Sequence, residues 1–279
     1  MSNITVGINR THLYISIVMK RILAALIFFT RLPFWRIANV PKECYEHVVP
    51  LWPLAGWLTG GIMAGVYYVC QMLMPIPVAV VAALTSRVLI TGALHEDGFA
   101  DFCDGMGGGT ERHRILEIMK DSHIGTYGVL GLILYYIIMY NVLVVMLPLT
   151  GCLLLLVGDV AAKMVSQSII WFLPYARKES EAKSKTVYAK TSAAEKAVSI
   201  TTGILPMLAV VMTTHIQPVV FTAGLTASVV VAAILFRMMH RSIQGYTGDC
   251  CGATFIMTEA AFHLAALLAM FQIISGEVH

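Results

Sequence analysis

The chain has 279 residues, of which 58% are hydrophobic and only 13% are charged. An ordinary soluble domain would carry about 25% charged residues, so this balance excludes that class. The formal net charge of +3 is too small to indicate a nucleic-acid-binding protein. Apolar runs of nearly 20 residues recur along the chain, and a helix needs about that length to cross a bilayer. The sequence therefore predicts an all-α, polytopic helical bundle in the membrane, with residues 1–279 forming a single integral membrane domain.

The first apolar segment, residues 13–30, is interrupted by Lys20 and Arg21. A full span would place both charges inside the bilayer. We therefore expect an N-terminal interfacial or partly inserted helix whose basic side chains reach the membrane surface.

Seven more uniformly apolar segments follow and are predicted to span the membrane. The connections between them alternate between short, uncharged turns and long loops that carry Lys or Arg. The positive-inside rule places such basic loops in the cytoplasm, so we expect a multi-pass protein of the cytoplasmic (inner) membrane with its C-terminus outside. The predicted spans cover approximately residues 54–74, 76–94, 126–147, 151–173, 197–216, 218–238 and 253–275, and the long loops are 95–125, 174–196 and 239–252.

The most informative stretch lies in the first long loop and begins at His95. Asp97, Asp101 and Asp104 follow the spacing i, i+4, i+7, which would put three carboxylates on one stripe of a helix. Three such carboxylates repel one another unless a cation lies between them, and hard oxygen ligands suit Mg²⁺. The alternative is a solvated acidic connector at the membrane surface.

Glycine and basic residues follow the aspartates. Residues 105–109 read GMGGG, which predicts a tight turn whose N–H groups can point at an anion. Arg112, Arg114 and Lys120 then add positive charge. Metal-binding acids, an amide-rich turn and basic side chains together indicate a diphosphate or phosphoryl-transfer site.

Several ionisable residues fall inside the predicted spans, where each is costly and hence a functional candidate. Arg87 is expected to neutralise an aspartate of the acidic stretch or to be structural. Asp159 and Lys163, at i and i+4, form either a helix-tethering pair or part of a substrate site. Glu259 is expected to reach the site of the acidic loop. Asp249, just before the last span, is either a helix N-cap or a fourth acid facing the cluster.

With these loops in view, the sequence resembles the cobalamin synthase family, adenosylcobinamide-GDP ribazoletransferase. The similar motifs are HEDGFADFCDG at 95–105, RILEIMKDS at 114–122, IGTYG at 124–128 and TGDCCGA at 247–253, with Glu259 and the N-terminal FFTRLP at 28–33. The chain departs from the family pattern in a few places. His123 stands where members often have Arg, Ile256 where many have another Glu, and Lys163 near a Ser-Arg pair of some members.

The resemblance implies the final step of adenosylcobalamin nucleotide-loop assembly. Adenosylcobinamide-GDP and α-ribazole (or α-ribazole 5′-phosphate) would give adenosylcobalamin (or its 5′-phosphate) and GMP, with Mg²⁺. The enzyme would be a phosphotransferase of the substituted-phosphate-group class. Its partners would be these substrates and the lipid bilayer, with no nucleic acid. A homo-oligomer and association with other enzymes of cobalamin synthesis are compatible with the sequence.

The residues can be given expected roles in this reaction. Asp97, Asp101 and Asp104 would hold Mg²⁺ on the diphosphate and offset charge on the leaving GMP. Either His95 or Asp121 would take the proton of the attacking ribose hydroxyl. The remaining expected substrate- and phosphate-binding residues are Gly105, Gly107, Gly108, Gly109, Arg112, Lys120, Ser122, Asp249 and Glu259.

Two other functions are compatible with part of these features. A CDP-alcohol phosphotransferase, which makes phospholipids, shares the DxxDG start found at residues 101–105, but the Ala-Arg and the later Asp-x-x-x-Asp of those enzymes are absent. A transporter would explain intramembrane Asp159, Lys163 and Glu259. Transporters place such residues near the midplane on broken helices, whereas the richest chemistry of this chain lies in loops.

Overall fold

The computed structural model describes residues 2–177 and 188–277 and is helical throughout, with no β-strand in these ranges. Part of the basic 174–196 loop that supported the topology prediction, including Lys178, Lys183 and Lys185, lies outside the described residues. The helices are α1 (Ser2–Phe29), α2 (Trp52–Leu73), α3 (Ile76–Thr91), α4 (Leu94–Gly108), α5 (Arg112–Ile118), α6 (Thr126–Val144), α7 (Pro148–Ser166), α8 (Ser168–Phe172), α9 (Ala193–Thr213), α10 (Pro218–Ser242) and α11 (Gly248–Glu277). Three short 3-10 helices, η1 (Phe34–Arg36), η2 (Lys42–His47) and η3 (Val49–Leu51), link α1 to α2.

The prediction of an all-α polytopic membrane protein is confirmed. Within the described ranges, six helical segments are long and apolar enough to cross a membrane. They correspond to six of the seven predicted spans, and the boundaries differ by a few residues. The segments are Val49–Leu73, Thr126–Val144, Pro148–Phe172, Ala193–Thr213, Pro218–Ser242 and Gly248–Gly276.

The remaining predicted span, 76–94, corresponds to α3, which does not meet the length and hydropathy requirements for a span on its own in the described part of the chain. The chain bends by 90° between α3 and α4, and the two helices make a seventh span only if the bent pair is counted as one. Gly92 and Ala93 both have positive φ, at 64° and 57°, which ends α3. Arg31 packs into the bend, where a Cβ on Gly92 would lie 2.4 Å from its Nε. The apolar run ends at Leu94, so the sequence predicted the end of the span to within a few residues but did not predict the 90° angle between the helices.

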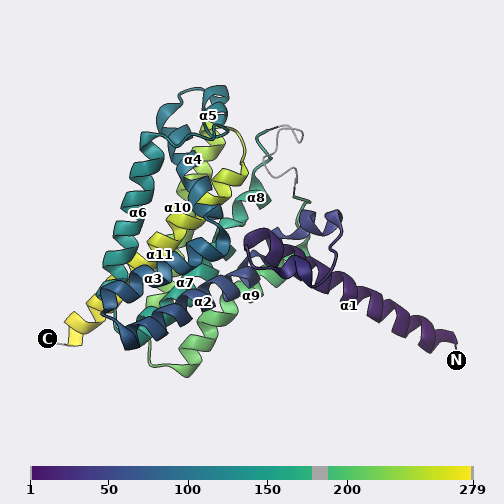
Figure 1. The fold of residues 1–279 in the computed structure, drawn as a ribbon, viewed down its shortest axis with the longest axis horizontal. Coiled ribbons are helices and arrows are strands. Elements are labelled where there is room, and N and C mark those ends of the chain that lie inside the picture. Colours follow the sequence, from purple (N-terminus) through teal and green to yellow (C-terminus); the bar gives the residue numbers. More distant parts are fainter. Residues whose placement is uncertain (1, 178–187, 278–279) are drawn as a thin grey trace.

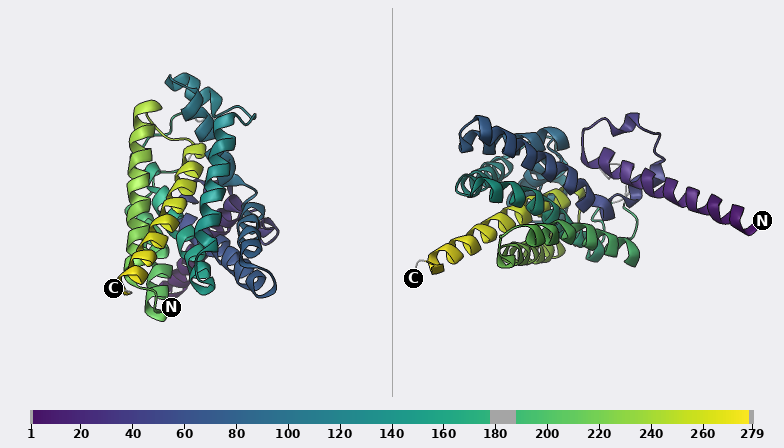
Figure 2. Two further views of the ribbon diagram at one scale, coloured as in Figure 1. Left: turned by 90° about the vertical axis from the view of Figure 1, so that its left-hand side faces the viewer. Right: turned by 90° about the horizontal axis from the view of Figure 1, so that it is seen from below.

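The end of the N-terminal helix α1 packs on the bundle, whereas its first turns extend away from it (Figure 1). The helix extends to one side, with the N-terminus far from the other helices, in Figures 1 and 2. It is not among the helices that pass the membrane-span criteria in the described part of the chain. Its interfacial position stays a prediction.

The three long loops meet at one end of the bundle, where Figure 1 shows α5 and the end of α4. The main chain of Ala176 donates to the Tyr246 carbonyl at 2.8 Å, and Tyr246 donates to Pro174 at 2.9 Å. The Arg112 guanidinium, at the start of α5, donates to the carbonyls of Ile243 (2.9 Å) and Ala176 (2.6 Å). Loops distant in sequence thus form one surface, as expected if all three face the same side of the membrane.

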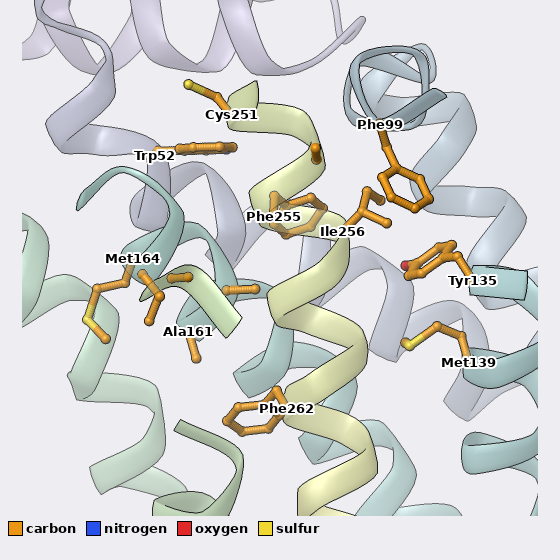
Figure 3. Close-up of a cluster of buried hydrophobic side chains, with 14 of the residues drawn as sticks. Trp52, Phe99, Tyr135, Met139, Ala161, Met164, Cys251, Phe255, Ile256 and Phe262 are labelled. Atoms are coloured by element: carbon orange, nitrogen blue, oxygen red, sulfur yellow. The ribbon is translucent and has the colours of Figure 1, made fainter. Parts of the chain in front are cut away.

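Helix α11 supplies the middle of the core. Figure 3 shows Phe255, Ile256 and Phe262 of α11 among side chains from α2, α4, α6 and α7. Ile256 is fully buried there, so the position where many relatives of the resembled family carry a glutamate is apolar in this chain. Because α11 also begins at the loop surface, its packing fixes the position of the residues at its first turn.

Candidate active site

The site begins where α4 crosses α11. A Cβ on Gly98 of α4 would lie 3.1 Å from the Asp249 Cα, and a Cβ on Gly252 of α11 would lie 2.9 Å from the His95 carbonyl oxygen. The two main chains are therefore nearly in contact, which only glycine allows at such distances. This crossing brings the acidic motif beside the TGD motif.

A cavity of about 280 Å³ opens beside the crossing, and we call it the α4–α11 pocket. Its lining includes three predicted site residues, His95, Asp97 and Asp249. Asp97 is exposed, whereas His95 and Asp249 are buried. Asp249 thus lies on the same cavity as the first residue of the acidic motif.

Arg177 also lines this pocket and was missed as a site residue. The Nη2 atom of Arg177 lies 3.5 Å from Asp249 Oδ2 and 3.2 Å from the Leu116 carbonyl oxygen. Its side chain is only 4% exposed, and its Nε has no hydrogen-bond partner among the described residues. The sequence marked Arg177 only as one of many basic loop residues, because its position depends on the pairing of residues 174–176 with Tyr246.

The three aspartates of the acidic motif lie on α4 as predicted, but in different surroundings. Asp104 is buried and accepts hydrogen bonds from the main-chain N–H groups of Gly125 (2.7 Å) and Gly128 (2.9 Å). Both of its oxygens therefore bind the start of α6, a favourable place for a negative charge. Asp101 is half-buried, one helical turn from exposed Asp97.

The donor set suits Mg²⁺ in part. No three His, Cys, Asp or Glu side chains converge as a metal site within the described ranges. Protein-bound Mg²⁺ often takes one or two carboxylates and completes its shell with water and substrate phosphate. The carboxylates of Asp97 and Asp101 fit that manner of binding, whereas Asp104 is engaged with main-chain N–H groups.

The predicted glycine turn at 105–109 is wrong. Residues 105–108 continue α4, and the Gly109 N–H donates to the Gly105 carbonyl at 3.0 Å. A Cβ on Gly105 would lie 2.5 Å from Met119 Cγ, and one on Gly107 would lie 2.5 Å from Tyr127 Cγ. These glycines, with Gly108 at the helix end, let neighbouring segments approach closely. The structure requires these residues to be small so that other segments can pack against them. It does not require the backbone flexibility of glycine on which the predicted turn was based.

The predicted basic residues occupy different places. Arg112 donates to main-chain carbonyls, as described above, and so ties the loops together. Lys120 is exposed and lines, with Arg112 and Arg177, a neighbouring polar groove of about 630 Å³. Arg177 is therefore shared between this groove and the α4–α11 pocket.

Asp121 and Ser122 lie exposed on the turn between α5 and α6. Hydrogen bonds from the His123 side chain (2.7 Å) and main-chain N–H (3.0 Å) hold the pKa of the Asp121 carboxyl below its usual value. A lowered pKa makes a carboxylate a weaker base. His123, where the resembled family often has Arg, contacts Asp121 in this chain.

Glu259 lies within the bundle and does not line the pocket. It accepts hydrogen bonds from Arg87 (2.5 Å) and the Tyr135 hydroxyl (2.6 Å), and Arg87 also pairs with Glu96 at 3.2 Å. The expectation that Arg87 neutralises an aspartate of the acidic motif is wrong, since its closest ionic partners are Glu259 and Glu96. Glu96 was not identified from the sequence at all.

Asp159 and Lys163 form the helix-tethering pair rather than part of the pocket. Both are fully buried, and Lys163 Nζ lies 2.5 Å from Asp159 Oδ2 and 2.8 Å from the Thr59 hydroxyl. Thr59 also donates to Asp159 Oδ2 at 2.7 Å, so hydrogen bonds from Thr59 and Lys163 to one carboxylate oxygen join α2 and α7.

Comparisons with known proteins agree with the motifs. The family described as cobalamin-5-phosphate synthase matches residues 21–267. An adenosylcobinamide-GDP ribazoletransferase of Shewanella woodyi is 34% identical over 254 residues, covering 87% of this chain and 93% of the relative. Proteins of the same name from Vibrio parahaemolyticus and Leptospira interrogans are 32% and 31% identical, covering 91% and 88% of this chain and 94% of each relative. No solved structure matches the chain. The chain therefore belongs to the cobalamin-5-phosphate synthase family.

Proposed function

We propose that this protein joins adenosylcobinamide-GDP to α-ribazole or α-ribazole 5′-phosphate, giving adenosylcobalamin or its 5′-phosphate and GMP. Family membership over most of the chain supports this reaction. One structural observation carries the placement of the chemistry: Asp97 and Asp249, from two distant family motifs, line the same pocket with Arg177.

The reaction is a phosphotransfer in this proposal. The oxygen of a ribose hydroxyl forms a bond to the phosphorus next to cobinamide, and the bond from that phosphorus to the GMP oxygen breaks. The hydroxyl proton passes to a base, and GMP leaves with the bonding electron pair. Because charge gathers on the diphosphate, the site must supply positive charge.

The residues of the pocket can divide this work. The Arg177 guanidinium would bind phosphate oxygens in the bidentate manner that arginine favours. Mg²⁺, held by Asp97 and Asp101, would neutralise charge on the diphosphate when bound. The base remains His95 or Asp121, and geometry favours His95, which lines the pocket while Asp121 lies on an exposed turn.

The neighbouring polar groove would serve the same reaction. It shares Arg177 with the pocket and carries Lys120 at its surface. A phosphate-bearing part of a substrate would therefore stay close to the basic side chains of Arg177 and Lys120 as it extends from the pocket into the groove. We place this surface on the cytoplasmic side of the inner membrane, since the long loops that form it are basic.

The rival functions are not favoured. The relatives reported above are named ribazoletransferases, and none is a CDP-alcohol phosphotransferase or a transporter. The charged residues inside the bundle pair with one another, as Arg87 does with Glu259.

The test uses the purified protein in liposomes, with adenosylcobinamide-GDP and α-ribazole 5′-phosphate in the presence of Mg²⁺ or EDTA. A CDP-alcohol substrate pair is supplied in parallel. We expect GMP and a cobalamin product in the Mg²⁺ sample alone. CMP from the parallel sample, without GMP, would contradict the proposal.

A further inference from the structure

The α4–α11 pocket contains an aromatic wall that phosphate chemistry does not use. The rings of Phe29 and Trp52 are stacked, with centroids 5.4 Å apart and an interplanar angle of 4°. Phe28 lies edge-on to Phe29 at 5.0 Å and to Tyr188 at 6.1 Å. All four residues line the pocket, together with Tyr175. The wall joins the end of α1, the start of α2 and the stretch that leads into α9.

Polar atoms without partners lie beside this wall. Trp52 Nε1, His95 Nε2 and Arg177 Nε are buried and make no hydrogen bond among the described residues. A buried polar atom without a hydrogen-bond partner lowers stability. All three atoms belong to residues that line one cavity, and the ribose and phosphate oxygens of a nucleotide would supply the missing partners.

The wall suits a flat ring with an apolar edge. Besides the aromatic residues, the pocket is lined by Val49, Leu94 and Ile170. Guanine carries hydrogen-bonding groups on its edge, and these would be left unpaired against aliphatic side chains. The dimethylbenzimidazole base of α-ribazole presents methyl groups at its edge and stacks on aromatic rings without that cost.

The charged residues fix how such a base would connect to the reaction. Asp97, Arg177 and Asp249 line the same cavity as the aromatic wall. A nucleoside whose base stacks on the wall therefore has its ribose within reach of the residues assigned to the diphosphate. The volume of about 280 Å³ admits one base and its sugar but not a corrinoid as well.

We propose that the α4–α11 pocket is the subsite for the base of α-ribazole, and that Phe28, Phe29 and Trp52 form its stacking wall. The inference rests on the proposed function, and it assigns the second substrate to a particular cavity. The corrinoid substrate then approaches from outside this pocket, with only its diphosphate reaching Arg177.

The first test measures equilibrium binding of α-ribazole 5′-phosphate to the full chain in liposomes, without adenosylcobinamide-GDP. The variants are Phe28→Leu and Trp52→Phe, which keep bulk while altering the stack. Phe172→Leu is the matched control, because Phe172 is 69% exposed and outside the pocket. We expect Kd to rise about tenfold in the first two variants, the size of one lost stacking contact, and to stay unchanged in the control.

A second test needs no variant and so is independent of folding. Ribonucleotides with unsubstituted benzimidazole or a purine base replace α-ribazole 5′-phosphate in binding to the unaltered protein. We expect weaker binding without the methyl groups and the weakest binding for the purine.

The outcomes separate the two proposals. In one outcome, α-ribazole 5′-phosphate binds tightly and the wall variants weaken this binding, but the protein releases no GMP. That outcome would overturn the proposed function and support the subsite. GMP release with wall variants that raise KM for adenosylcobinamide-GDP alone would instead place guanine in the pocket and overturn the subsite. Absence of α-ribazole 5′-phosphate binding to the unaltered protein would also overturn it.

Discussion

At the scale of single residues, three aspartates at regular helical spacing have unlike surroundings. Asp97 is exposed on the α4–α11 pocket, whereas the two oxygens of Asp104 bind N–H groups at the start of α6. The spacing i, i+4, i+7 places residues on one stripe of a helix but does not specify what packs against each position. The roles of the aspartates should therefore separate on substitution.

Asp97→Asn and Asp104→Asn make this separation measurable. We expect Asp97→Asn to lower GMP release on the order of 100-fold with unchanged thermal stability, because a ligand for charge neutralisation is lost. In Asp104→Asn, the amide can accept only one of the two hydrogen bonds, so the free energy of unfolding should fall by about 1–3 kcal/mol. Near-normal turnover of Asp97→Asn at limiting Mg²⁺ would remove that residue from the site.

The pH dependence distinguishes the two candidate bases. Hydrogen bonds from His123 lower the pKa of Asp121 in the folded protein. The contact therefore stabilises the fold at pH values above the unfolded-state pKa, and this stabilisation is lost as the pH falls through the folded-state pKa. His123→Ala should return the pKa of Asp121 upward towards its usual value. If Asp121 were the base, the acid limb of the rate profile would move to higher pH.

We expect the acid limb to stay in place in His123→Ala, because Asp121 lies outside the pocket. Asp121→Asn should likewise retain GMP release within about threefold, whereas loss of a general base costs about 100-fold or more. A moved acid limb together with a large loss in Asp121→Asn would reassign the base from His95 to Asp121.

At the scale of elements, close helix contacts create the site. Gly98 and Gly252 let α4 and α11 touch, and the bend at Gly92 and Ala93 redirects α4 towards the loop surface. Polar contacts inside the bundle then join α3, α4, α6 and α11 through Arg87, Glu96, Tyr135 and Glu259. Changes at these contacts should affect activity without touching a substrate.

Gly252→Ala tests the crossing. The added Cβ would lie 2.9 Å from the His95 carbonyl oxygen, so α11 must shift away from α4. We expect GMP release to fall by about tenfold or more, since misplacement of about 1 Å can cost up to about 100-fold. Gly61→Ala is the matched control in α2, where a Cβ would meet nothing within 4 Å. Equal activity of the two variants would mean that the crossing does not position the site.

Arg87→Met tests the buried network. Glu259 and Glu96 would lose their cation in the bundle interior, and breaking a buried ion pair costs about 3–5 kcal/mol. Denaturant unfolding in detergent measures this loss. The double variant Arg87→Met/Glu259→Gln should recover part of the stability, because one of the two uncompensated carboxylates is removed. No recovery in the double variant would show that the ion pair itself is not the cause.

At the scale of the whole molecule, the length of the apolar segments was enough to predict most of the membrane-spanning helices. Six of seven predicted spans are confirmed because about 20 apolar residues have few alternatives to a membrane helix. The 90° angle between α3 and α4 was not predictable, because it depends on the backbone conformation of Gly92 and Ala93 and on packing with distant segments such as the one that holds Arg31.

The candidate site was predicted less completely than the fold. The motifs identified His95, Asp97 and Asp249, which the structure brings to one pocket. Arg177 was missed, and Glu259 was expected at a site that it does not line, since both positions depend on which loops and helices pack together. Residue type and spacing along one chain do not contain that information.

In the proposed function, GMP release and cobalamin formation are one reaction at the α4–α11 pocket. The most direct measurement quantifies both products in proteoliposomes, for the unaltered protein and for Arg177→Gln. We expect equal amounts of GMP and cobalamin product that depend on Mg²⁺, and a loss of both on the order of 100-fold in the folded variant. GMP without cobalamin product, or an Arg177→Gln variant with normal yields of both, would contradict the account.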